Sequence, residues 1–530
     1  MRALLRCRLA NALLLVLPIV AGTSRGVLSQ EPATIMPTAE VILEPMPTVE
    51  DPWFAPLERL PPIDRELSAE GTHYEPWRAF ETQAAFAQPL FEQPPLTGDA
   101  TPPATPLLED ADEDSIVERL NELERRLTEY DAREREAALE ADEQDSSLFS
   151  VIVFGRIQAD AVWFDQSTAS RAAVGPVRDG VDFRRARLGM MGDGFDIFFY
   201  RLEVDFALQD LDTRERPVIT DCYLDTRDLP FAGTLRAGRF REPASLELLG
   251  STNDQLFMER ALSDTFTPVR NNGVETFRTL FDERMTTYTA VTKDNVNAFG
   301  EGTGNTGEWC FTQRLTWLPW YDEPSEGRYL LHVGGSYSFR DADEHQTRFR
   351  NVPEIRMQQG PNTLQPFVDT GFIPSDNYQV VGLEALSIWG PLSFQTEYHS
   401  ALVNQIGGPN LYFDGYYVAG SFLLTGENRG YDREIGTYTA LIPYENFFRV
   451  AGDRDIIMGK GAWELTARYS SLDLDSQNVS GGQLDDITLG LNWYFALRTR
   501  WMFNYIHSRL LQNGAYSAVD IFGVRFQVVW

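Results

Sequence analysis

The chain has 530 residues, a net charge of −32 and a mean hydropathy of −0.29. The acidic charge argues against a nucleic-acid-binding protein, because such proteins need a basic face to displace counterions from phosphates. No internal stretch of about 18 apolar residues is present to cross a membrane as a helix. Composition still fits either a soluble protein or a transmembrane β-barrel, since barrel strands alternate lipid-facing and lumen-facing residues.

The N-terminus predicts an export signal. Arg2, Arg6 and Arg8 precede an apolar core at 9–21, and small residues follow that core. This order of a positive region, a short apolar region and small residues is typical of secretory signal peptides. We therefore assign residues 1–24 to a signal peptide.

Two further regions precede the largest one. Residues 25–110 are rich in Pro, Glu, Ala and Thr without a sustained period, which predicts a disordered spacer. Residues 111–146 carry apolar side chains at the a/d spacing of a coiled coil, namely Ile116, Leu120, Leu123, Leu127 and Tyr130. An amphipathic helix lying on the rest of the protein is the alternative. We favour an oligomerising coiled coil, because so short a helix is marginal alone.

Residues 148–530 predict a transmembrane β-barrel. Segments of about ten residues alternate apolar and polar side chains and are separated by Gly, Asp, Asn and Pro turns. In "FSVIVFGRIQADAVWF", Arg156, Gln158 and Asp160 oppose an apolar face, and "FFYRLEVDFAL" repeats the pattern. A soluble sandwich would bury its apolar face against a second sheet, whereas charges in the middle of strands fit a water-filled lumen.

Aromatic residues support this interpretation. Pairs such as Trp163-Phe164 and Tyr416-Tyr417 recur where we expect strands to end, as in the aromatic belts at membrane interfaces. The last segment, "IFGVRFQVVW", has one unbroken apolar face that ends on Trp530. A barrel can end in this way because its last strand pairs with its first. The length of the region fits about 16 antiparallel strands, enough to enclose an aqueous channel.

No motif predicts catalysis or a metal site. The neighbours His399-Ser400 and His507-Ser508 lie on expected strands, where adjacent residues face opposite sides and cannot form a nucleophile–base couple. The carboxylates and glycines of 472–486 match no calcium loop, so we expect a solvated loop there. Two cysteines remain after the signal peptide, and no CxxC pair suggests zinc. We expect no enzyme, no metal and no cofactor.

Arginines recur on the expected lumen face. Arg185 and Arg187 share one side of "FRRARLGM", and Arg348 and Arg350 share one side of "QTRFRN". Stacked arginines would attract anions into a pore. Salt bridges between lumen residues are the alternative, and the spacing does not separate the two interpretations. Arg201 opens the lumen face of the next strand and belongs to the same set of arginines. In the alternative, these arginines pair with Glu203, Asp205, Asp221 and Asp225.

The sequence resembles a known family, the phosphate-selective porins O and P, which are trimeric outer-membrane barrels. The stretches "FGRIQADAVWFD", "FRRARLG", "YRLEVDFA" and "RAGRFREPASLELLGSTNDQLFMERAL" follow the family's N-terminal half in order. "GLEALSIWGPLSFQTEYHS", "GYYVAGSFLLTGENR" and "GAWELTARYS" follow its C-terminal half. The resemblance covers nearly all of 148–530. The spacer falls outside it, whereas many relatives also have a helix before the barrel.

The resemblance implies an arginine ladder and a constriction made by loops that fold into the pore. The matching residues are Arg156, the "FRRA" pair Arg184 and Arg185, two ladder positions at Arg348 and Arg350 with Val352 at the third, and Asp221 near the central site. Phosphate-specific members carry a lysine before the "ER" motif, where Asn253 and Asp254 stand here. Losing an ammonium and gaining a carboxylate predicts weaker anion binding.

We therefore predict a homotrimeric outer-membrane porin that passes small hydrophilic solutes, including anions such as phosphate or polyphosphate. Its expected partners are outer-membrane lipid, small anions, further copies of the chain and cell-wall material contacted by the spacer. The alternative is a structural barrel that tethers the envelope through the spacer, which transport does not require. The expected pore-lining and anion-binding residues are Arg156, Arg184, Arg185, Arg187, Arg201, Asp221, Arg348 and Arg350.

Overall fold

The computed structural model describes residues 149–207, 217–293, 309–342, 345–357, 364–448, 450–451, 456–457 and 459–530. The expected signal peptide, spacer and coiled-coil helix lie outside the described residues. The long strands are β1 (Ile152–Gln166), β2 (Gly180–Gly194), β3 (Phe198–Asp205), β4 (Val218–Leu229), β5 (Gly233–Phe240), β6 (Asn271–Leu280), β7 (Met285–Lys293), β8 (Trp309–Tyr321), β9 (Tyr329–Asp341), β13 (Ile373–Trp389), β14 (Leu392–Gln405), β15 (Leu411–Leu423), β20 (Ala462–Ser476), β21 (Val479–Ala496), β22 (Thr499–Gln512) and β23 (Ala515–Val529).

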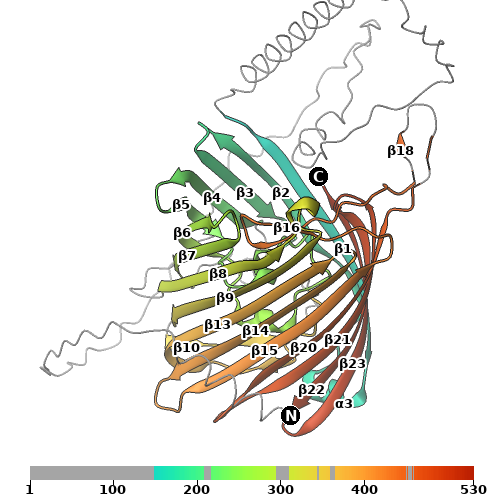
Figure 1. The fold of residues 1–530 in the computed structure, drawn as a ribbon. Coiled ribbons are helices and arrows are strands. Elements are labelled where there is room, and N and C mark those ends of the chain that lie inside the picture. Colours follow the sequence, from blue (N-terminus) through green and yellow to red (C-terminus); the bar gives the residue numbers. More distant parts are fainter. Residues whose placement is uncertain are drawn as a thin grey trace, which may run out of the picture. The chain divides into compact units, whose positions relative to one another are not determined.

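These sixteen strands form one closed antiparallel barrel (Figure 1). Each strand pairs with the next long strand in the chain, and β1 also pairs with β23. In that closing ladder Arg156 lies opposite Val529, and Gln166 lies opposite Val519. Closure leaves no strand edge with unpaired amides, as a hydrocarbon environment requires. The predicted barrel of about 16 strands is confirmed.

Short elements occupy the connections between the long strands. The helical ones are α3 (Thr168–Val174), α4 (Leu246–Leu249), η2 (Leu262–Phe266) and η3 (Glu323–Ser325). The extended ones are β10 (Gln346–Thr347), β11 (Arg350–Asn351), β12 (Val368–Asp369), β16 (Gly430–Asp432), β17 (Thr437–Thr439), β18 (Val450–Ala451) and β19 (Ile456–Ile457). None of the helices in the described part of the chain is long and apolar enough to cross a bilayer.

The period of two seen in the sequence sets which side chains face the lumen. In β1, Arg156 and Asp160 are each 3% exposed, whereas Ile157 is 40% and Trp163 is 47% exposed on the outer surface. In the last strand, Phe522 faces outward and its neighbour Ile521 is buried inside. The apolar face of each strand is therefore the outer face, and the polar face lines the interior.

Two local predictions are wrong. Tyr416 and Tyr417 lie in the middle of β15 and not at its end, and the buried Tyr417 hydroxyl donates to Glu397 at 2.7 Å. The segment 472–486 is not a loop, because β20 and β21 continue through it as a hairpin. Its Leu472 and Leu484 are both fully buried among interior side chains. The alternation of apolar and polar side chains in this hairpin is hard to recognise in the sequence, because many of its residues are acidic.

The connections differ between the two ends of the barrel. We call the end that holds the C-terminal residue the turn end, because short connections such as 230–232, 390–391 and 497–498 lie there. The opposite end, the loop end, carries long connections that include 241–270 (loop A) and 342–372 (loop B). Short turns at one end and long loops at the other are typical of outer-membrane barrels. Both ends have exceptions. The connection 424–461 is long and yet starts and finishes at the turn end, and the connections 477–478 and 513–514 at the loop end are short.

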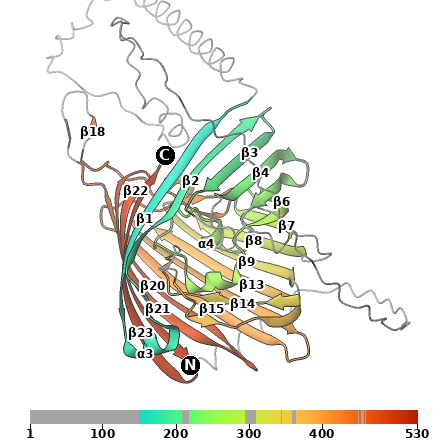
Figure 2. The ribbon, with the colours of Figure 1, turned by 180° about the vertical axis from the view of Figure 1, so that it is seen from behind.

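Loops A and B pack inside the barrel and form an apolar core with its inner wall. Met258 and Leu262 of loop A and Ile355 of loop B join a buried cluster with inward-facing residues of β13–β15 and β20–β23. Figure 2 shows α4 of loop A within the ring of strands. A Cβ at Gly523 of β23 would lie 2.9 Å from the Met258 sulfur. The inner wall therefore carries no side chain at the point where loop A packs against it. One side of the lumen is therefore filled.

Candidate functional site

A β-bulge turns two adjacent arginines of β2 into the lumen. Gln158 of β1 pairs with Arg185, and Ala159 pairs with Phe183, so Arg184 is the extra residue between them. Regular alternation would place Arg184 on the lipid-facing side. The extra residue instead lets both guanidinium groups face inward, and both side chains are buried.

Glu203 of β3 brings three of the predicted residues together. Its Oε2 accepts from Arg156 Nη2 at 3.0 Å and from Arg201 Nη2 at 2.7 Å, and its Oε1 accepts from Arg187 Nη1 at 2.7 Å. Arg187 Nε also donates to Asp205 at 2.6 Å. These charge-assisted bonds hold the guanidinium groups in fixed positions on β1, β2 and β3. The arrangement confirms that lumen salt bridges exist.

Two arginines from the ends of loop A extend this group. Arg270 Nε and Nη2 donate to the Asp221 carboxylate at 2.9 and 3.1 Å, and Arg201 Nε lies 3.9 Å from the same carboxylate. Arg241 Nη1 donates to the carbonyl of Gly250 at 2.9 Å. Burial, followed by the nearby charge of Arg270, lowers the pKa of Arg241 to about 9, so it stays protonated at neutral pH. We call these residues, with those around Glu203, the Glu203 network.

A second group, the Glu259 network, surrounds a carboxylate of loop A. Arg184 binds Glu259 through Nε at 2.8 Å and through Nη2 at 3.0 Å. Arg525 of β23 donates to Glu259 Oε1 and to both oxygens of Asp160, each at 2.7 Å. Arg185 stands at the edge of this group, where its Nη2 is 4.0 Å from Glu259. Arg185 is therefore the least compensated arginine of the network.

Arg348 and Arg350 lie in loop B, away from the strands that hold the other predicted residues. Arg348 Nε donates to Asp369 at 2.8 Å, beside the short ladder of β11 and β12. Arg350 is exposed, and its charge acts on the same Asp369 carboxylate. Arg356, later in loop B, is a further arginine whose charge interacts with Glu259.

Sequence reasoning missed four arginines that the structure adds to the site. Arg241, Arg270 and Arg356 lie in connections where no strand period indicates a facing direction. Arg525 could have been found, because it is the single charge opposite the apolar face of the last strand. Its position between outward-facing residues was the available signal.

The two networks together hold more positive than negative charge. Counting only the residues joined by the ion pairs and hydrogen bonds given above, they contain eight arginines and five carboxylates, an excess of three positive charges. The arginines are Arg156, Arg184, Arg185, Arg187, Arg201, Arg241, Arg270 and Arg525, and the carboxylates are Asp160, Glu203, Asp205, Asp221 and Glu259. A cluster of this sign inside a low-dielectric wall attracts anions.

The start of loop A is fixed by a buried carboxylate. Glu242 is fully buried and accepts from Asn271 Nδ2 at 2.6 Å and from Thr292 Oγ1 at 2.8 Å. It also accepts from Thr312 Oγ1 at 3.1 Å and from Arg340 Nη1 at 2.8 Å. One side chain thus ties loop A to β6, β7, β8 and β9.

A hairpin enters the lumen from the turn end. We call residues 430–439, which contain β16 and β17, the inner hairpin. Arg314 of β8 donates through Nη2 to the Gly436 carbonyl at 2.7 Å and to Glu384 at 2.6 Å. Thr437 Oγ1 donates to the Leu246 carbonyl of α4 at 3.2 Å. Loop A and the inner hairpin therefore meet inside the barrel, although they enter from opposite ends.

Comparisons with known proteins show which proteins the chain resembles. The sequence model of a family described as phosphate-selective porin O and P matches residues 151–530. Porin O of Pseudomonas aeruginosa is 26% identical over 420 residues, which cover 72% of this chain and 89% of that protein. An uncharacterized protein of Caulobacter vibrioides is 27% identical over 338 residues, 62% of each chain. The anion-selective porin from Comamonas acidovorans is 14% identical with a TM-score of 0.42, over 72% of this chain and all of that one.

Proposed function

Because the chain belongs to the phosphate-selective porin O and P family, we propose that it passes small hydrophilic anions, phosphate and polyphosphate among them, by diffusion through its lumen. The family and the closed barrel place the protein in the outer membrane as a porin. The observation that carries the anion preference is the excess of arginine in the Glu203 and Glu259 networks. Anions are drawn to such a cluster, and cations are repelled from it.

The networks give the proposal a physical mechanism. Arg201 keeps 23% of its side chain exposed while it donates to Glu203. The ion pair already fixes this guanidinium group before a solute arrives, so little conformational entropy is lost when the solute binds to it. Its remaining N–H groups can donate to phosphate-like oxygens. Because the arginines are partly neutralised by carboxylates, the contact is weak enough for the solute to leave again.

Single-channel recording in planar bilayers tests the proposal. The wild-type protein should form stepwise channels whose reversal potential under a KCl gradient favours chloride. Arg185→Gln should lower the anion-to-cation permeability ratio by about twofold to fivefold, because Arg185 is the least compensated charge of its network. Its cost in stability should be small, about 1 kcal/mol, since it donates one close hydrogen bond, to Gln158.

Arg187→Gln is the control for the stability cost that is expected of Arg185→Gln. It removes the same charge from the same strand, but Arg187 binds Glu203 and Asp205 at 2.7 and 2.6 Å. Removing one partner of a buried pair should cost about 3 kcal/mol or more in unfolding free energy. Channels that prefer potassium in the wild type, or an unchanged permeability ratio in Arg185→Gln, would contradict the anion proposal.

We also propose that the chain is exported by residues 1–24 and assembles as a homotrimer through residues 111–146. The a/d spacing of that segment supports the assembly. Deleting 111–146 from the full chain should lower the fraction of trimer in detergent at equal protein concentration, as measured by native mass. A trimer of unchanged stability would show that the segment does not hold the subunits together.

A further inference from the structure

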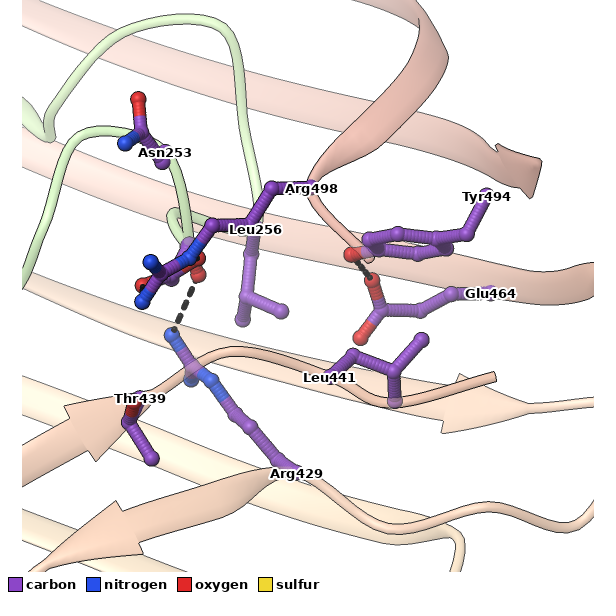
Figure 3. A pocket seen from close by; sticks show the side chains of 9 residues that line it. Asn253, Leu256, Arg429, Thr439, Leu441, Glu464, Tyr494 and Arg498 are labelled. Carbon is purple, nitrogen blue, oxygen red and sulfur yellow. Dashed lines mark hydrogen bonds and ion pairs between the residues drawn. The ribbon is translucent and has the colours of Figure 1, made fainter. Parts of the chain in front are cut away.

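A small cavity at the turn end is lined by two arginines that point toward each other (Figure 3). Arg429 comes from the 424–461 connection, and Arg498 comes from the turn between β21 and β22. The tip of loop A supplies Asn253 and Asp254. The space open to the centre of a water molecule is about 10 Å³, which is room for about one water and not for an oxyanion.

Asp254 fills this cavity with a carboxylate. Arg498 Nε and Nη2 donate to Asp254 Oδ1 and Oδ2 at 3.2 and 3.3 Å, a two-pronged contact. Arg429 Nη2 donates to the backbone carbonyl of Asp254 at 3.4 Å. A forked guanidinium binds carboxylate and phosphate oxygens in the same way. The Asp254 carboxylate therefore stands where a free oxyanion would be held.

Asp254 leaves one donor of the cavity lining without an acceptor. Arg429 is buried, its guanidinium lies 3.7 Å from the centre of the Tyr438 ring, and its Nε has no hydrogen-bond partner among the described residues. Arg429 Nη1 donates to Gln395 Oε1 at 2.8 Å. The nearby Glu464 already accepts from Tyr494 at 2.8 Å. A buried donor without an acceptor is rare and costly, so an oxyanion that reached Arg429 Nε would pair a group that Asp254 leaves unpaired.

We propose that Asp254 is a built-in competitor that occupies an oxyanion site formed by Arg429 and Arg498, and that it limits how strongly the pore retains phosphate. The proposal rests on the anion function above and identifies the side chain that sets its strength. A tethered carboxylate has an effective concentration in the millimolar range or higher, so a dilute free anion does not displace it. Solutes therefore pass the turn end without being held there.

The test compares phosphate block of wild-type channels with that of Asp254→Asn and Asp254→Ala. Asn removes the charge and keeps the volume, whereas Ala removes both and opens space for an oxyanion. We expect inorganic phosphate to block the Ala variant at concentrations at least about tenfold lower than wild type, with the Asn variant in between. Adding Arg498→Gln to Asp254→Ala should abolish the gain.

Glu326→Gln, in the exposed turn between β8 and β9 at the same end, is the control for charge alone. The oxyanion site would be contradicted if Glu326→Gln lowered the blocking concentration of phosphate as much as Asp254→Ala does. It would also be contradicted if Asp254→Asn and Asp254→Ala lowered it equally, because the change would then reflect only the loss of a negative charge at this end of the barrel. Phosphate-induced stabilisation against heat, measured in detergent, is a second readout that needs no channel. If wild type forms no channels, the porin function fails. The site itself fails if phosphate stabilises Asp254→Ala no more than wild type.

Discussion

Replacing Glu242 with alanine is expected to raise single-channel conductance by about twofold, because loop A is released from the wall and the lumen widens. The same change should lower the unfolding free energy by about 3–5 kcal/mol, since the buried guanidinium of Arg340 loses the carboxylate that it binds at 2.8 Å. Conductance in planar bilayers and urea unfolding in detergent measure the two effects.

Glu242→Gln distinguishes the contribution of the negative charge of Glu242 from that of the hydrogen bonds that it accepts. Gln keeps an acceptor for Asn271 and Thr292 but does not neutralise Arg340, so both effects should be intermediate. If Glu242→Ala leaves conductance and unfolding unchanged, then loop A is held mainly by its apolar contacts. Met258, which rests against Gly523, would then be its main anchor.

Removing the inner hairpin should have the larger effect on conductance. Replacing residues 428–442 with a short Gly-Ser linker is expected to increase conductance by about threefold and to weaken ion selectivity, because the turn end opens. The deletion takes away the partners of Thr286, Tyr288 and Arg314, which bind hairpin carbonyls at 2.7 to 3.3 Å. Arg314 keeps Glu384, so the barrel should still fold.

A shortening of the same connection at 450–457 is the control for this deletion. Those residues contain β18 and β19, which pair with each other and with no other strand in the described part of the chain. Conductance should stay near the wild-type value in the control. Equal conductance in the hairpin deletion and in wild type would show that the constriction lies elsewhere, at loop A.

The barrel could be predicted from the sequence because its signal is local. Alternation in "GRIQADAVWF" separates Arg156 and Asp160 from Ile157 and Trp163 without any knowledge of neighbouring strands, and the structure keeps that separation. The apolar face that ends at Trp530 likewise predicted a closing strand. Strand number followed from length, since each crossing of the membrane uses a nearly constant number of residues.

The lumen could be predicted only in part, because its contacts join distant segments. The alternation within β2 gives no sign of the bulge that turns Arg184 inward. The path of the 424–461 connection into the barrel depends on acceptors and donors that lie more than 100 residues away, such as Arg314 for Gly436. Arg348 and Arg350 share a face in sequence, yet nothing in their spacing indicates that Arg348 pairs with Asp369.

The ladder between β1 and β23 also constrains how the protein folds. It joins Arg156 to Val529, so the wall cannot close until nearly the whole chain is present. Pairing across such a separation is slow, because most of the chain entropy is lost before the contact forms. The bonds of Glu203 to Arg156, Arg187 and Arg201, by contrast, link β1, β2 and β3, which are neighbours in sequence, and can form early. The arginines that we assign to solute passage would then also hold the first strands together while the barrel is still an open sheet.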